Sequence, residues 1–370
     1  MRSRTKCLIG ASLFVVAGSA AAQSSVTLYG VADSFIEYSG NGAKHSWSER
    51  SGGGNASMFG LEGKEDLGGG LKAIFDLENG YNINDGSGFV DPTAMFYRQA
   101  WVGLNHADYG RLTFGRQYQP TVLAIYPTDP FLGNELLSPA TIVGAVDVNT
   151  LATQSIQERT SNSILYQSPV IGGLRLMAMY GLSATTTQPV PQNTGNMVDV
   201  GIAYSGYGLY AAVAYQNQHA STVTLPGLPG PLNQPGTEHF TAGLAYRIGI
   251  VNLQANYMYS RSKDAPAGSL AALLGAGHSF ATMEFGATIQ ATAADTIEIA
   301  CLYRNVRGAH DNTPGAEIGI DHLLSKRTSI YARAGYMKNN GTATTSWPGV
   351  VVSGPNATQT MVALGMTHRF

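Results

Sequence analysis

The sequence predicts an all-β chain that folds as one closed, antiparallel up-and-down barrel of sixteen strands and crosses a membrane. Three observations support this prediction. Segments of about ten residues alternate between apolar and polar side chains, which is typical of strands with two different faces. The connections alternate between tight turns and longer loops. Charged residues make up only 12% of the chain, below the usual share in soluble proteins, while Gly (45) and Tyr (19) are abundant.

The alternation is clearest in the segments 251–260, 281–290 and 297–304. In the first of these, Val251, Leu253 and Tyr257 share one face, and polar residues occupy the other. The phase is ambiguous in 94–105 and 109–117. Sixteen such segments begin near Ser24, Asn55, Gly69, Ala94, Tyr109, Ser161, Gly172, Asn196, Gly208, Thr237, Ile250, Ser279, Asp295, Gly315, Thr328 and Gln359.

Connection length is the second regularity. Tight turns are expected at 67–69, 107–108, 168–172, 206–207, 249, 293–294 and 325–326. Longer Gly- and Pro-rich loops are expected at 40–54, 79–93, 184–195, 219–236, 262–278, 308–314 and 339–358. This sorting is typical of an outer-membrane barrel, with turns at the periplasmic rim and loops outside. Two soluble β domains are the alternative, but no shift in composition marks a boundary.

The first residues have the composition of an export signal. Arg2, Arg4 and Lys6 precede an apolar run over 7–18 and the small residues 20–22. We expect a signal peptide over 1–22, cleavage between Ala22 and Gln23, and a single barrel domain over 23–370; an uncleaved anchor is the alternative. Removing three of the 22 basic residues leaves 19 against 24 acidic ones, a balance of −5.

One stretch, 118–158, interrupts the alternation for far longer than an ordinary connection. Its prolines exclude a central strand or a long helix, at Pro120, Pro127, Pro130 and Pro139. It is nevertheless rich in apolar residues, which argues against disorder. A lumen enclosed by sixteen strands is too wide for wall side chains to fill, so this stretch can fold inward as a constriction.

Several motifs resemble the trimeric general porins of Gram-negative bacteria, in particular the β-proteobacterial porins of Burkholderia, Bordetella and Neisseria. They cover the whole mature chain: SSVTLYGVADSFIEYSG, GLEGKEDLGGGLKAIFDLENGY, FYRQAWVGL, LTFGRQYQP, RTSNSILYQSPVIGGLRLMAMYG and LGMTHRF. The resemblance implies a homotrimer in the cell outer membrane, with lipid and lipopolysaccharide around it. Each barrel would be a passive pore for small hydrophilic solutes, with its third external loop folded inward.

The terminal Phe370 matches the signal by which the family's last strand is recognised by the outer-membrane assembly machinery. A lipid-facing aromatic at the barrel rim is the simpler interpretation, and the two are compatible.

The resemblance also implies that acids on the inward loop face arginines on the opposite wall, which sets ion selectivity. The loop candidates are Asp129, Glu135 and Asp147, with Glu158 near the loop's exit; each could instead be a solvated surface carboxylate. The motif-matched wall arginines are Arg98 and Arg116. Alternation alone adds Arg175, Arg247, Arg304 and Arg333 on lumen-facing phases.

The second segment departs from the family pattern. Met58 and Glu62 occupy positions where Arg and Lys are common in the family, and Lys64 lies two residues further along the same face. Together with the balance of −5, this predicts weak ion selectivity with a slight preference for cations.

Other functions find little support in the residues. The sequence lacks H-E-x-x-H, G-x-S-x-G and Cys-x-x-Cys motifs and a phosphate-binding loop, so we expect no catalytic residues, no metal and no cofactor. No basic patch suggests nucleic-acid binding. An outer-membrane barrel enzyme remains a minor alternative, because spacing does not exclude it. A substrate-specific channel is another, in which Tyr118, Tyr126 and Phe131 would contact a solute.

Overall fold

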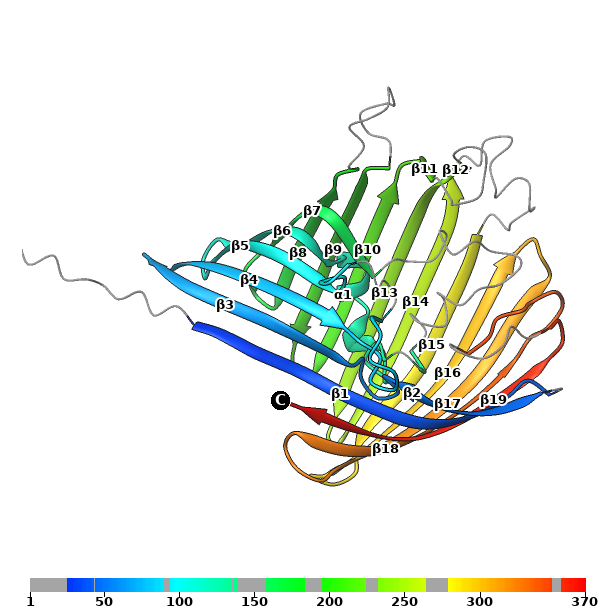
Figure 1. The fold of residues 1–370 in the computed structure, drawn as a ribbon. Coiled ribbons are helices and arrows are strands. Elements are labelled where there is room, and N and C mark those ends of the chain that lie inside the picture. The colour runs from blue at the N-terminus through cyan, green and yellow to red at the C-terminus, as the bar shows by residue number, and fades with distance from the viewer. Residues whose placement is uncertain are drawn as a thin grey trace, which may run out of the picture.

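A single antiparallel sheet closes on itself to form the barrel seen in the computed structural model (Figure 1). The structure describes residues 25–42, 44–89, 94–134, 136–138, 158–183, 195–223, 232–263, 279–347 and 354–370. Consecutive strands are hydrogen-bonded neighbours around almost the whole ring, and the last strand pairs with the first. The predicted all-β, up-and-down barrel is therefore confirmed.

Sixteen strand positions make up the wall. In ring order they are β1 (Ser25–Gly40), β3 (Met58–Gly68), β4 (Leu71–Gly80), β5 (Gln99–His106), β6 (Gly110–Tyr118), β7 (Arg159–Gln167), β8 (Leu174–Gly181), β9 (Met197–Gly206), β10 (Leu209–Gln218), β13 (Gly236–Ile248), β14 (Val251–Lys263), β15 (Ser279–Gln290), β16 (Asp295–Arg307), β17 (Asp311–Leu323), β18 (Thr328–Lys338) and β19 (Thr358–Arg369). The sheet counts 17 strands because β2 (His45–Ser51) shares the second position with β3.

The shared position arises because β1 pairs with two strands along one edge. Its first half pairs with β3, and its second half pairs with β2. The expected loop 40–54 thus contains a wall strand, and the chain leaves the wall only between β2 and β3. β2 consists mainly of serines and charged residues, so a search for alternating apolar residues does not detect it.

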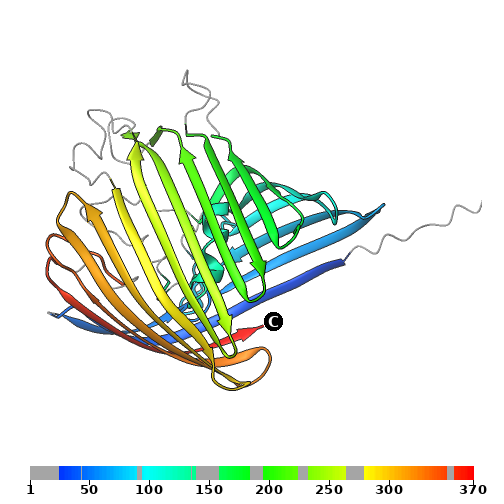
Figure 2. The same cartoon turned by 180° about the vertical axis from the view of Figure 1, so that it is seen from behind.

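Two other expected loops also differ. The connection at 308–314 is a tight turn, because β17 already begins at Asp311. The expected loop 219–236 contains a short hairpin of β11 (Ser221–Val223) and β12 (Leu232–Gln234). The strand ends that border the remaining long connections lie at one end of the barrel, here called the loop rim, and the tight turns lie at the other, the turn rim (Figures 1 and 2).

The two faces of the wall follow the predicted alternation. On β16, Glu298, Ala300 and Leu302 are buried toward the interior, whereas Ile299 is 40% exposed on the outside. On β1, the residues from Val31 to Ser39 alternate in the same way. The barrel thus has an apolar outer face and an inner face that carries most of the polar side chains.

Among the described residues, helical structure occurs only in the stretch after β6. It comprises α1 (Pro120–Leu123) and a 3-10 turn, η1 (Tyr126–Thr128). None of the described helices has the length and apolar character needed to span a bilayer. Figure 1 shows α1 inside the barrel, as expected for a constriction loop.

The ring closes at Phe370 and Gly30. The Phe370 backbone N–H donates to the Gly30 carbonyl at 3.0 Å, and the Gly30 N–H donates back at 3.1 Å. The Phe370 ring lies over Gly30, where an added Cβ would stand 2.3 Å from the ring and 2.7 Å from the Met58 carbonyl oxygen. Gly30 is therefore the position at which only a hydrogen side chain lets the terminal aromatic close the seam.

Replacing Gly30 with valine should destabilise the folded barrel by about 1–3 kcal/mol, because the new side chain must displace the Phe370 ring or the β3 backbone. Thermal unfolding in detergent, followed by circular dichroism, measures the effect. Gly354→Val is the matched control, because nothing lies within 4 Å of a Cβ there. Equal melting temperatures for the two variants would contradict this account of the seam.

Candidate functional site

The stretch after β6 is held inside the barrel at its start by hydrogen bonds to a buried carboxylate. Asp199, on the inner face of β9, accepts hydrogen bonds from the Thr121 backbone N–H at 3.2 Å and from the Thr121 hydroxyl at 2.7 Å. Gln216 of β10 donates to the same carboxylate at 3.3 Å. Asp199 therefore receives the first turn of α1, whose N–H groups have no partner within the helix.

Further along, wall side chains donate to the backbone carbonyls of the loop. The Thr241 hydroxyl donates to Thr121 at 2.9 Å, and the Tyr210 hydroxyl donates to Ala124 at 3.0 Å. The other two contacts, from Gln254 to Pro127 and from Asn256 to Thr128, measure 3.2 and 3.3 Å. These donors come from β10, β13 and β14, so the loop is fixed across three adjacent strands.

Apolar packing holds the next part of the loop. Phe131, Leu136 and Leu137 are at most 5% exposed and form one cluster with Trp347 and Met361. The loop's apolar residues therefore pack against the inner wall and against the segment before β19. Leu132 is the exception, with 70% of its surface exposed.

Two more segments fold inward that the sequence analysis assigned to ordinary loops. Between β2 and β3, the N–H of Asn55 donates to the buried Asp33 carboxylate at 3.0 Å, and Tyr331 donates to it at 2.7 Å. Before β19, the Thr345 carbonyl accepts from Asn339 and Gln359 at 3.0 and 2.6 Å. Three inward segments therefore narrow the lumen from different sides.

The segments 54–56 and 130–134 border one interior cavity together with charged side chains of the wall. Met58, Tyr118 and Tyr126 also line it. Its charged lining is Arg98, Glu158, Arg159, Glu298, Asp321, Arg333 and Arg369. This cavity is the candidate functional site.

On one side of the cavity, two arginines share a tyrosine. Arg98 forms an ion pair with Glu78 at 2.6 Å and donates to the Tyr118 hydroxyl at 3.0 Å. Arg159 pairs with Glu158 at 2.6 Å, donates to the same hydroxyl, and stacks 4.2 Å from the ring centre. The two guanidinium groups are thus fixed side by side next to the start of the loop.

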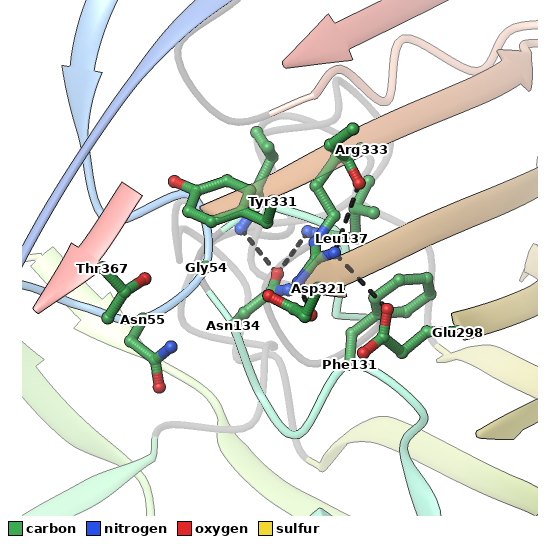
Figure 3. A network of polar contacts seen from close by, with 12 residues as sticks. Gly54, Asn55, Phe131, Asn134, Leu137, Glu298, Asp321, Tyr331, Arg333 and Thr367 are labelled. Atoms are coloured by element: carbon green, nitrogen blue, oxygen red, sulfur yellow. Dashed lines mark hydrogen bonds and ion pairs between the residues drawn. The ribbon is translucent and has the colours of Figure 1, made fainter. Parts of the chain in front are cut away.

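On the other side, Arg333 of β18 lies between two acids. It pairs with Asp321 at 2.6 Å and with Glu298 at 3.4 Å. Figure 3 shows this group next to Phe131 and Asn134 of the inward loop. Across from the arginine pair, the cavity therefore carries two carboxylates around one cation.

A second polar recess lies nearer the turn rim. It is lined by Glu62, Lys64, Asp76, Trp101 and Arg111 among others. Register places Glu62 opposite Thr27 and Lys64 opposite Ser25, on the inner face. The two residues face the lumen, but at a different level from Arg98. Their link to the cavity is Tyr29, which donates to Asp76 at 2.8 Å and to Glu78 at 3.1 Å.

The predicted loop acid Asp129 has a structural position instead of a lumen-facing one. It is 3% exposed, and its carboxylate accepts the backbone N–H groups of Phe131 and Gly133, both at 2.8 Å. Burial raises the pKa of this carboxyl above its ordinary value, while the hydrogen bonds act in the opposite direction. The acid that does line the cavity is Glu158. Glu135 and Asp147 lie outside the described residues.

The predicted wall arginine Arg116 is not brought together with Arg98 in the cavity. It is paired in register with Ala100, on the same face as the exposed Val102. Its side chain donates to the Tyr97 carbonyl and to Ser161 at 2.9 Å. A family motif assigned Arg116 to the lumen, whereas alternation places it on the same phase as Leu112 and Phe114, which are exposed on the outer face.

The four arginines predicted by alternation alone lie at different levels of the barrel. Arg333 lines the cavity. Arg304 is 1% exposed and donates to Thr345 at 3.2 Å, so the segment before β19 covers it. Arg247 lies near the turn rim beside Pro127. Arg175 is opposite Ala203, also toward the turn rim.

Sequence reasoning missed four charged residues of the cavity: Arg159, Glu298, Asp321 and Arg369. Glu298 was visible on the polar face of its segment, and alternation could have identified it. Arg369 donates to Asn55 at 3.0 Å, and no local sequence pattern reveals a contact between residues so far apart in the chain.

Comparison with known proteins agrees with this geometry. A family model described as Gram-negative porin matches residues 10–342. The chain is 28% identical to an outer membrane porin protein of Bordetella pertussis, over 99% of this chain and 100% of the relative. It is 27% identical to outer membrane porin protein 32 of Delftia acidovorans, over 99% of each. An anion-selective porin from Comamonas acidovorans has a similar fold, with a TM-score of 0.76, 24% identity, and coverage of 94% of this chain and 100% of that one.

Replacing Asp199 with alanine should loosen the start of the inward loop, because the Thr121 N–H and hydroxyl lose a common buried acceptor. The expected cost is about 1–3 kcal/mol in the free energy that holds the loop against the wall. Hydrogen–deuterium exchange over residues 120–138 should become faster, while exchange in the wall strands stays slow. Asp295→Ala, at the turn rim, is the matched control. Unchanged exchange in the loop would show that Asp199 does not anchor it.

Proposed function

Because the chain belongs to the Gram-negative porin family, we propose that it is a passive diffusion channel for small hydrophilic solutes and ions across the outer membrane. The observation that carries the proposal is the inward loop, which wall side chains hold across the lumen beside a cavity of fixed opposite charges. A wide barrel with a polar interior conducts water and solutes, and its narrowest charged passage sets what passes.

In this proposal, the selectivity site is the cavity around Arg98, Glu158 and Arg333. Glu62 and Lys64 act one level lower, toward the turn rim, and Glu135 and Asp147 remain candidate loop acids. Asp129 shapes the loop through its backbone hydrogen bonds.

Weak ion selectivity follows from the pairing of charges in the cavity. Arg98, Arg159 and Arg333 each have a carboxylate partner within 3.4 Å. The lining holds four arginines and three acids, and Met58 occupies a lining position that a family arginine would otherwise fill. This near balance favours neither ion strongly, and it gives no support to a cation preference based on the charge of the whole chain.

We further propose a homotrimer, which agrees with a trimer form among the similar folds, an outer membrane protein of Vibrio cholerae (TM-score 0.64, 13% identity, coverage of 94% of this chain and 99% of that one). Val26 and Leu28, 65% and 60% exposed on the outer face of β1, are suited to a subunit contact. The proposal also includes a signal peptide over 1–22, Phe370 as an assembly signal, surrounding lipid and lipopolysaccharide, and no catalytic activity.

Purified protein added to a planar bilayer should give stepwise conductance increases, with three equal sublevels per insertion if each subunit has an open pore. Heat-unfolded protein is the control. Absence of conductance from correctly folded protein would reject the channel, whereas single steps without sublevels would reject only the trimer.

Met58→Arg should shift selectivity toward anions, because it adds an unpaired positive charge to the cavity lining. We expect the potassium-to-chloride permeability ratio to fall by about twofold or more. Reversal potentials in a KCl gradient measure this ratio. Tyr207→Arg is the control, since Tyr207 is 97% exposed in the turn between β9 and β10. Equal shifts in the two variants would show that the cavity does not set selectivity.

A further inference from the structure

The inward loop carries one large apolar side chain that is not buried. Leu132 is 70% exposed and lines the cavity, whereas the preceding Phe131 is 5% exposed and packs in the cluster with Trp347. The Leu132 backbone has a φ of +51°, in the left-handed region that residues with a Cβ rarely adopt. Burial cannot account for a leucine in this conformation, so its position calls for a functional explanation.

The loop's own hydrogen bonds hold Leu132 in this position. Three consecutive backbone N–H groups donate to Asp129. Those of Phe131 and Gly133 reach its carboxylate, both at 2.8 Å. That of Leu132 reaches its carbonyl at 3.1 Å, and the Asn134 N–H then donates to the Phe131 carbonyl at 3.1 Å. This turn fixes Phe131 against the wall and Leu132 toward the cavity.

Other apolar groups extend the surface around Leu132. Pro130 and Tyr126 line the same cavity. The Tyr126 ring packs on Gly133, where an added Cβ would stand 2.6 Å from it. On its other side it meets the Tyr118 ring, with 5.9 Å between the ring centres. We call Tyr126, Pro130 and Leu132 the apolar ledge.

An arginine pair adjoins one end of the apolar ledge. Arg159 stacks 4.2 Å from the centre of the Tyr118 ring, and Arg98 donates to the Tyr118 hydroxyl at 3.0 Å. Both cations are therefore one aromatic ring away from the ledge. The acid paired with Arg98 is Glu78, which is 4% exposed, so Glu158 is the acid that faces the cavity here. Two cations and one acid face the solute at this end.

A group with the opposite balance adjoins the other end of the ledge. The ring of Phe131, next to Leu132 in the chain, lies 6.0 Å from the Arg333 guanidinium (Figure 3). Arg333 is held by Asp321 at 2.6 Å and by Glu298 at 3.4 Å. Two acids and one cation face the solute here, so the apolar ledge lies between charges of opposite sign.

We propose that this cavity is a binding site for small zwitterions with an apolar side chain, the chemistry of an α-amino acid such as leucine. The carboxylate of the solute lies toward Arg98, its ammonium group toward Glu298, and its side chain on Leu132. The cavity volume of about 350 Å³ suits a molecule of this size. This inference rests on the proposed channel function, and it adds the class of solute that the passage favours.

The test measures how strongly added solutes block the single-channel KCl current. Leucine and asparagine have nearly the same shape and the same two charges, but their side chains differ in polarity. Isocaproate lacks the ammonium group of leucine, and isoamylamine lacks its carboxylate. Leucine should reach half-maximal block at a concentration about threefold or more below that of each of the other solutes.

Leu132→Asn removes the apolar contact and keeps the backbone of the loop, because Asn tolerates the left-handed region better than Leu does. The preference for leucine over asparagine should fall to about one, whereas Leu132→Met should keep it. Tyr207→Asn is the matched control, since Tyr207 has a φ of +53° and is 97% exposed in the turn between β9 and β10. Hydrogen–deuterium exchange over residues 120–138 should be the same in all variants.

The proposal is overturned if Leu132→Asn keeps the preference for leucine, or if Leu132→Met or Tyr207→Asn abolishes it. It is equally overturned if isocaproate or isoamylamine blocks as strongly as leucine does. In each of these cases the KCl current is still present, so the channel function stands. A folded protein without any KCl current rejects the channel and this class of solute together.

Discussion

The structure depends on one constraint: within a bilayer, every backbone N–H and C=O group must find its partner inside the protein. The sheet therefore has to close, and it closes where β19 pairs with β1 from Val31–Arg369 to Gly40–Thr360. The terminal Phe370 extends this pairing to Gly30 by two further backbone hydrogen bonds. Closure fixes which side of each strand faces inward, so a single seam determines the two faces of the whole barrel.

A closed wall with a polar inner face can hold other backbone in its interior. The inward loop makes short-range backbone hydrogen bonds of its own between Gln119 and Asn134. Wall donors such as Thr241 and Gln254, and wall acceptors such as Asp199, bond to further backbone groups of the loop. The inner face thus serves two purposes at once: some polar residues hold the loop, and others remain at the cavity as charges.

Period-two alternation and loop length were sufficient to predict the sixteen wall positions, the closure and the position of the inward loop, but not β2, because the first three depend on which face meets lipid. They failed where contacts join distant parts of the chain. Asp33 holds Asn55 and Tyr331, and nothing in the sequence near Asn55 indicates that its segment turns inward. Arg116 was assigned to the lumen from a family motif, although its alternation with Leu112 and Phe114 places it on the outer face. Asp129 is an acid by sequence, but its two N–H contacts make it part of the loop's own framework.

The pairing of charges, more than their number, determines the electric field inside this barrel. In the cavity, Arg98 and Arg333 are held by carboxylates at 2.6 Å, so they contribute a fixed field with little net charge. A passing ion meets opposite charges on opposite sides and is not retained, as a conducting passage requires.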